Sequence, residues 1–288
     1  MCGVFGFAGT SNFRTSLLLQ ALCVADQVRG KHSTGLAITC GGGSRLVKKA
    51  VCGSRFVEER HAEFLFRNRY SLAIGHNRHA TSGAVTDRNA HPFSLWRGSL
   101  GKDYGCHNGI VDCADEVAKA YGIRSWEVDS EVVLRAIGRH RGKTEEDLVQ
   151  ALTEMNRLIS AQSDYAFLYV ASNLKAIYFW RSEERPLVVF DARKDGLGRW
   201  LCSTEKIFGS AWKSLGAALP SGKRVTWFEA KPHRLYRLPA DGVNEVEPVA
   251  DLPRRKRPEK PATDDSPWWE PEEERKARGC AWQGDLFI

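Results

Sequence analysis

The order of the predicted elements constrains the fold most strongly. Residues 112–159 show helical spacing of apolar side chains, whereas residues 165–238 contain mostly short apolar segments of strand length. Helices followed by a run of strands are typical of α+β proteins, in which helices cover antiparallel sheets. We therefore predict layered α+β packing. The predicted strands of the second region are 165–171, 176–180, 187–190, 200–203, 225–229 and 234–238, with a helix over 205–215.

Three helices are predicted in the first region, over 112–121, 130–140 and 144–159. Asp112 is a candidate N-cap of the first, and Thr144 with Asp147 fits a capping-box variant at the third. Upstream, Gly41-Gly42-Gly43 separates two predicted strands. A glycine-rich loop that binds phosphate leads into a helix, so we interpret this one as a hairpin turn. The other upstream predictions are strands 4–8, 36–39, 45–51 and 72–75 and helices 15–28 and 56–66.

Composition divides the chain near residue 240. Hydrophobic residues make up 42% of the 288, which suffices for a sizeable core. After residue 250, prolines punctuate a charged stretch with few aliphatic side chains, although the last nine residues are again partly apolar. We expect a globular domain over 1–240 and a flexible tail over 241–288.

Charge and hydropathy exclude several classes of protein. The 42 Lys and Arg against 35 Asp and Glu give +7, but the basic residues form no periodic stripe, so we expect no direct nucleic-acid binding. The sequence has no apolar run of the roughly 18 residues that a membrane span requires and no apolar leader at its start. We expect a cytoplasmic protein without a membrane segment, whose eight cysteines remain reduced.

Cys2 differs from the other cysteines because of its position. Removal of Met1 would place a thiol and a free α-amine on one residue. An α-amine has a pKa of about 7.7–8, so a useful fraction is neutral near pH 7. Such an amine can act as the general base for its own thiol, which is the N-terminal variant of the nucleophile–base pair.

Polar segments punctuated by glycine accompany the predicted strands, where sites are commonly built. They are 29–35, 75–83, 89–93, 107–110 and 129–131. His76, His79, His91 and His107 lie close together in the sequence, but no cysteine or carboxylate stands at ligand spacing from these four histidines. We therefore expect no metal site, and nothing in the sequence indicates a cofactor.

These segments together resemble the class II glutamine amidotransferase family of N-terminal nucleophile hydrolases. The matching motifs are Cys-Gly-Val-Phe-Gly from residue 2, Arg-Gly-x-x-Ser-x-Gly, His-x-Arg-x-Ala-Thr-x-Gly, Asn-Ala-His-Pro, His-Asn-Gly-Ile and Asp-Ser-Glu, in the family's order. A late motif, Ser203-Thr204-Glu205, extends the resemblance to about residue 210, and the strand pattern extends it to about 240. The resemblance implies a four-layer αββα sandwich.

By this resemblance Cys2 is the nucleophile that attacks the glutamine carboxamide, forming a γ-glutamyl thioester and releasing ammonia. Asn108 and the backbone N–H of Gly109 would supply the oxyanion hole, where one donor is typically worth about 2.7–4 kcal/mol. Taken alone, the Asn-Gly pair is also the signature of a hairpin turn.

The resemblance also implies a substrate pocket. Arg78 would bind the α-carboxylate, Thr81 would add a hydroxyl, Asp129 would bind the α-ammonium group and His91 would line the pocket. Arg29 would support the nucleophile strand. The structural alternatives are a surface ion pair for Arg78 and a helix N-cap for Asp129. His79 departs from the family, whose members usually carry Trp or Tyr there.

The function that follows is a stand-alone glutaminase of the amidotransferase type, supplying ammonia to a separate synthase that is its partner. Two alternatives remain: hydrolysis of another γ-glutamyl amide, and a catalytically silent module that recruits partners. In the tail, Gln283, Leu286 and Phe287 match a short peptide that docks bacterial sliding clamps. Docking to another partner, or no role, are the alternatives for this segment.

Overall fold

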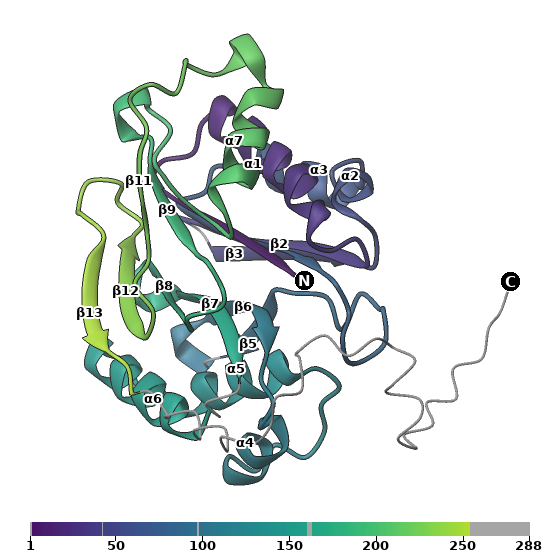
Figure 1. Ribbon diagram of the computed structural model, residues 1–288, viewed down its shortest axis with the longest axis vertical. Helices are drawn as coiled ribbons and strands as arrows, with labels where there is room; N and C mark the ends of the chain where they lie inside the picture. The colour runs from purple at the N-terminus through teal and green to yellow at the C-terminus, as the bar shows by residue number, and fades with distance from the viewer. Residues whose placement is uncertain (1, 42, 97, 160–162, 254–288) are drawn as a thin grey trace, which may run out of the picture. The chain divides into compact units, whose positions relative to one another are not determined.

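The computed structural model describes residues 2–41, 43–96, 98–159 and 163–253. Two antiparallel sheets lie face to face, with helices on both outer faces (Figure 1). The first sheet has the order β11 (Thr226–Glu229), β9 (Val188–Asp191), β10 (Arg199–Cys202), β1 (Gly3–Ala8), β4 (Leu72–Arg78), β2 (Ser33–Cys40) and β3 (Gly43–Lys49). The second has the order β13 (Glu247–Asp251), β12 (Arg234–Pro239), β8 (Ala176–Arg181), β7 (Asp164–Ala171), β6 (Lys102–Ile110) and β5 (Phe93–Trp96).

One group of helices covers each sheet, which completes the four layers that the resemblance implies (Figure 1). The first sheet carries α1 (Phe13–Ala25), α2 (Gly53–Phe56), α3 (Arg60–Arg67) and α7 (Glu205–Ser214). The second carries α4 (Ala114–Ala120), α5 (Asp129–His140) and α6 (Glu145–Leu158). Short 3-10 segments are η1 (Asp26–Val28), η2 (Gly98–Leu100), η3 (Ser172–Leu174), η4 (Arg193–Asp195) and η5 (Gly216–Ala218).

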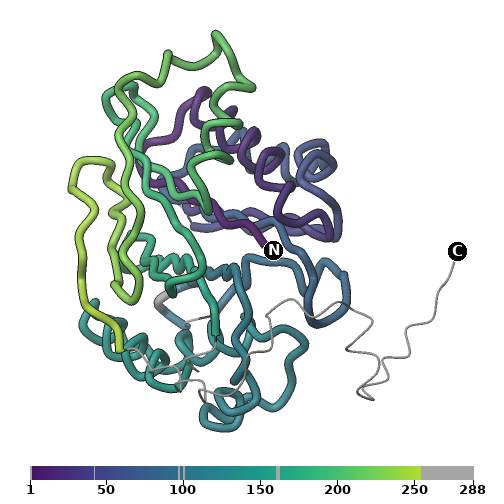
Figure 2. Tube along the Cα trace, in the orientation of Figure 1, coloured from purple at the N-terminus to yellow at the C-terminus, as the bar shows by residue number. Residues whose placement is uncertain are grey.

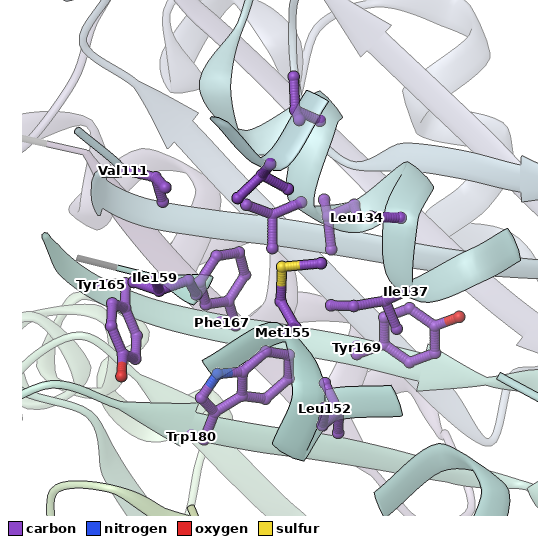
Figure 3. Close-up of a cluster of buried hydrophobic side chains, with 14 of the residues drawn as sticks. Val111, Leu134, Ile137, Leu152, Met155, Ile159, Tyr165, Phe167, Tyr169 and Trp180 are labelled. Atoms are coloured by element: carbon purple, nitrogen blue, oxygen red, sulfur yellow. The ribbon is translucent and has the colours of Figure 1, made fainter. Parts of the chain in front are cut away.

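The core follows from the two-residue period of the strands. In β1, Val4 and Ala8 face the second sheet, whereas Phe5 and Phe7 face the helices of the first. The second sheet alternates in the same way against α4, α5 and α6. Figure 3 shows Met155 of α6 within that cluster, near Phe167 and Trp180 of the sheet. Each sheet therefore buries both faces.

Several predicted elements are confirmed. β2 and β3 form the hairpin expected around the three glycines. Thr144 and Asp147 form the expected capping box at the start of α6. Asp112 is not a cap, because α4 begins at Ala114 and no side chain caps it.

The helix predicted over 56–66 is wrong as one element. α2 ends at Phe56 and α3 begins at Arg60, because Glu59 between them is extended, with φ −67° and ψ 128°. Two short helices allow Phe56 and Phe66 to be buried against the same sheet.

Strand β1 is internal to its sheet, although it lies at the start of the chain. It pairs with β4 on one side and β10 on the other, so residues about 200 positions apart meet. The colour change across this sheet, from purple to green, follows that pairing (Figure 2). The expected domain limit at residue 240 remains a prediction; β13, which follows it, pairs with β12.

No helix among the described residues is both long enough and apolar enough to span a membrane. The predicted docking residues Gln283, Leu286 and Phe287 lie outside the described residues.

Candidate active site

Cys2 stands immediately before β1 and is held there on two sides. Its Sγ is 3.3 Å from both the backbone N–H and the carbonyl oxygen of His79, which follows β4. Arg29 Nε donates to the Cys2 carbonyl oxygen at 2.6 Å. Separate loops therefore hold the thiol and the backbone of Cys2.

Small side chains and one serine allow this arrangement. A Cβ on Gly3 would lie 2.0 Å from Asp26 Oδ2, and a Cβ on Gly30 would lie 2.3 Å from the carbonyl carbon of Arg78. Ser203 Oγ accepts from Val4 N–H at 2.8 Å, and Ser203 N–H donates to the Val4 carbonyl at 3.0 Å. The glycines of the first two motifs and the late motif thus set the position of β1, which Cys2 precedes.

The electrostatic environment of the Cys2 thiol contains opposing effects. Burial raises the pKa of Cys2, while the hydrogen bond from the His79 backbone and the positive charge of Arg78 oppose that rise. The negative charge of Asp129 acts in the same direction as burial. The net result is a raised pKa, which favours the neutral form of the Cys2 thiol.

Asn108 and Gly109 lie within β6, so they do not form the hairpin turn that the Asn-Gly pair alone suggests. The Asn108 side chain is fully buried, and neither its oxygen nor its nitrogen has a hydrogen-bond partner among the described residues. Gly109 has φ +139°, and a Cβ there would lie 1.8 Å from the Asp164 carbonyl oxygen. Only glycine fits this backbone conformation and this spacing.

A group of buried histidines joins the two sheets beside these residues. His76 Nε2, on β4, hydrogen-bonds the His107 carbonyl on β6 at 2.9 Å. The His76 and His91 rings stack with centroids 4.1 Å apart. Burial lowers the pKa of His76 to about 3 and that of His107 to about 4, and places that of His91 well below its usual value. All three rings are therefore neutral at pH 7.

The two expected charge-binding residues approach the same region from different elements. The buried guanidinium of Arg78 donates to Ala84 O at 3.1 Å and to Ser82 O, both in the loop after β4. Asp129 Oδ2 accepts from Val111 N–H at 2.8 Å and lies 4.0 Å from His107 Nδ1. Asp129 does not cap α5, whose N-cap is Val128. The charge of each acts on the Cys2 thiol.

Thr81, by contrast, lies exposed in the loop after β4. The structure thus brings Cys2, Arg29 and Arg78 together at one end of the first sheet. The hydrogen bond between His76 and His107 connects this end to the second sheet. His91 stacks on His76, Asn108 follows His107 in β6, and Asp129 lies near the His107 ring.

Sequence reasoning gave no role to several residues of this region. Ser130, although inside a quoted motif, hydrogen-bonds His107 Nδ1 at 2.7 Å. His32 Nδ1 accepts from Ala80 N–H at 2.9 Å. Asp26 is fully buried, and its carboxylate oxygens have no hydrogen-bond partner among the described residues. Ser130 and His32 lie inside recognised motifs, which is the signal that could have pointed to them, whereas Asp26 has none.

Within the described part of the chain, no group of three or more His, Cys, Asp or Glu side chains is arranged to hold a metal ion.

No protein-family model matches the chain. Curated relatives are glutamine–fructose-6-phosphate aminotransferases. One from Thermus thermophilus is 33% identical over 260 residues, which is 88% of this chain and 37% of that enzyme. One from Staphylococcus epidermidis is 29% identical over 194 residues, 66% of this chain and 30% of that enzyme. The chain thus spans about a third of the length of these relatives.

Solved structures share the fold. Glutamine phosphoribosylpyrophosphate amidotransferase from B. subtilis superposes with a TM-score of 0.65 at 18% identity, covering 86% of this chain and 49% of that one. A glutamine aminotransferase class-II domain protein from Silicibacter pomeroyi has a TM-score of 0.51 at 15% identity, covering 88% of this chain and 100% of that one.

The four layers, with a cysteine just before an internal strand, form an αββα sandwich, the fold that these solved structures share. The curated relatives then specify the family within this fold. The chain contains a domain of the class II glutamine amidotransferase family.

Proposed function

We propose that this protein hydrolyses the side-chain amide of glutamine through a γ-glutamyl thioester on Cys2 and delivers the ammonia to an acceptor. The observation that carries the proposal is the fixed thiol of Cys2 in the same region as an unpartnered, buried Asn108 amide. A buried amide without partners costs about 1–3 kcal/mol per unmade bond, so its retention favours a bond made only with substrate.

In the proposed reaction, removal of Met1 frees the α-amine of Cys2, which accepts the thiol proton as sulfur attacks the amide carbon. The oxyanion is bound by the Asn108 side-chain N–H and the Gly109 backbone N–H. Collapse of this intermediate breaks the C–N bond, and the proton moves from the amine to the leaving nitrogen as ammonia departs. Water, deprotonated by the same amine, then cleaves the thioester to give glutamate and restore the thiol.

Glutamine would be held by its charged end. Arg78 can bind the α-carboxylate with two parallel N–H groups once it releases the loop carbonyls that it now contacts. Asp129 would bind the α-ammonium group, with Thr81 and His91 as further pocket residues. The bond from Arg29 to the Cys2 carbonyl supports its role in holding the nucleophile strand.

The test is a Cys2→Ala variant compared with Cys40→Ala, since Cys40 is also a half-buried free cysteine but lies at the far end of β2. We expect Cys2→Ala to abolish ammonia release and the covalent adduct of a reactive glutamine analogue, detected by intact mass. Cys40→Ala should retain both. Full activity of Cys2→Ala would refute the proposal.

Two finer points belong to the same proposal. Comparing the turnover of glutamine with that of γ-glutamyl conjugates distinguishes a glutaminase from a hydrolase of another γ-glutamyl amide. We also propose that a synthase takes up the ammonia, because the matched relatives are named as aminotransferases. Co-purification followed by ammonia-transfer assays tests that point.

A further inference from the structure

The loop that holds the Cys2 thiol is itself held by a second histidine. Both contacts to Sγ come from the backbone of His79. His79 is exposed and lies just beyond the end of β4, where sheet pairing no longer fixes the backbone. Another contact must therefore set the position of this peptide.

That contact comes from the segment before β2. His32 Nδ1 accepts from the N–H of Ala80, the residue after His79, at 2.9 Å. The His32 and His79 rings stack with centroids 4.8 Å apart and an angle of 23° between their planes. The His32 backbone N–H donates to the Arg78 carbonyl at 3.0 Å. His32 thus contacts three successive residues, and its two hydrogen bonds go to the two peptide units whose other polar groups touch sulfur.

We infer that His32 is a positioning residue for the proposed reaction: its neutral ring, with Nδ1 as acceptor, fixes the His79 peptide against the nucleophile. The inference rests on the proposed function for its kinetic consequence but not for its geometry. Because Nδ1 accepts the Ala80 N–H, the proton of the neutral ring must lie on Nε2. Protonation of Nδ1 would remove the acceptor and place a positive ring against His79.

Few ionisable groups among the described residues face the stacked rings of His32 and His79. The Cys2 thiol lies on the His79 backbone, the α-amino group of the chain acts on the His79 ring, and Lys31 precedes His32. The α-amino charge, partial burial and the His32 ring together lower the pKa of His79, which favours the neutral stack. Arg78 turns its guanidinium away, toward Ala84.

Two variants separate the acceptor from the rest of the ring. His32→Asn keeps an oxygen near the position of Nδ1, whereas His32→Ala removes the acceptor. His61→Ala, an exposed histidine on α3, is the control. We expect His32→Ala to lower kcat for glutamine hydrolysis about 10- to 100-fold at pH 8, since small displacements of reacting groups have effects of that size. KM should stay within about threefold, because no substrate contact is removed.

Rescue by the conservative variant provides the readout that a merely structural role would not change. His32→Asn should retain wild-type kcat at pH 8 within about threefold, because its side-chain oxygen can still accept the Ala80 N–H, whereas His32→Ala should not. Wild-type kcat in His32→Ala, or an equal loss in His32→Asn and His32→Ala, would overturn the inference.

Nitrogen NMR of histidine-labelled protein tests the geometry without any substrate. At pH 8 the His32 signals should be those of an unprotonated Nδ1 and a protonated Nε2; a proton on Nδ1 would overturn the inference. Absence of glutamine hydrolysis by the wild type, with the expected tautomer present, would instead refute the proposed function. The two failures are therefore distinguishable.

Discussion

Strand β6 carries buried polar side chains toward both of its ends, and the two ends differ in how those groups are satisfied. Near its start, Asp103 Oδ2 accepts from Arg141 Nε at 2.7 Å and from Tyr169 OH at 2.8 Å. Asp103 Oδ1 accepts from Ser172 N–H at 3.0 Å. Near its end, the Asn108 amide has no partner among the described residues. One end of β6 thus carries a buried carboxylate whose hydrogen bonds are satisfied, and the other end carries a buried amide whose hydrogen bonds are not.

Asp26 sharpens the comparison because it is the same residue type as Asp103. Both carboxylates are fully buried. Asp26 packs against Gly3, the residue after Cys2, with no hydrogen-bond partner among the described residues, and burial raises its pKa to about 7. Buried polar groups normally find partners, so those left without them cost stability. The satisfied end stabilises the fold, and the unsatisfied groups concentrate where chemistry is proposed.

The largest expected effect comes from removing the Arg141–Asp103 ion pair near the start of β6. Arg141→Met would leave the buried Asp103 charge without its cation, which typically costs about 3–5 kcal/mol. We expect that loss in the free energy of unfolding measured with urea. Arg139→Met, an exposed arginine on α5, should cost less than about 1 kcal/mol. Equal losses in the two variants would contradict the contrast between the ends of β6.

The next effect depends on pH. Because the pKa of Asp26 is about 7 in the folded state against 3.8 for the unperturbed group, ionisation favours the unfolded chain as pH rises. The difference corresponds to about 4 kcal/mol above pH 7. Asp26→Asn should therefore raise the free energy of unfolding by up to about that amount at pH 8 and by little near pH 4. A gain that does not vary between these pH values would show that Asp26 does not titrate as proposed.

The third prediction separates function from stability at the unsatisfied end. Asn108→Ala should lower kcat by about 10²–10³, equivalent to about 2.7–4 kcal/mol, if its amide binds the oxyanion. The free energy of unfolding should fall by less than about 1 kcal/mol, because no intramolecular hydrogen bond is lost. Glutaminase assays and urea titrations of one preparation give both numbers. A stability loss as large as the catalytic one would mean that Asn108 is structural.

Much of the fold could be predicted because its signals are local. The capping box of α6 and the β2–β3 hairpin depend on neighbouring residues and were predicted from them. Strand β4, predicted over 72–75, continues to Arg78. Its last residues are polar but buried, because β1 and β2 pair with them on both sides. Tertiary pairing of this kind overrides a hydrophobic pattern.

The site could be predicted only where motifs carried it. Its candidate residues came from the family resemblance, and their roles await the experiments above. The His32–His79 stack and the burial of Asp26 depend on contacts between segments, such as the loop before β2 and the loop after β4, that no spacing rule relates. Inspection of residue types alone therefore identifies which groups can react but not which groups hold them in place.

The internal position of β1 also determines when the protein can mature. Phe5 pairs with Cys202, and Ser203 bonds Val4, so the ribosome must release more than 200 residues before the first strand has both neighbours. At about 5–20 residues per second, that interval is on the order of ten to forty seconds. Until then β1 lacks its pairing with β10. Late closure of the sheet would thus leave time for the proposed removal of Met1 before the strand is buried.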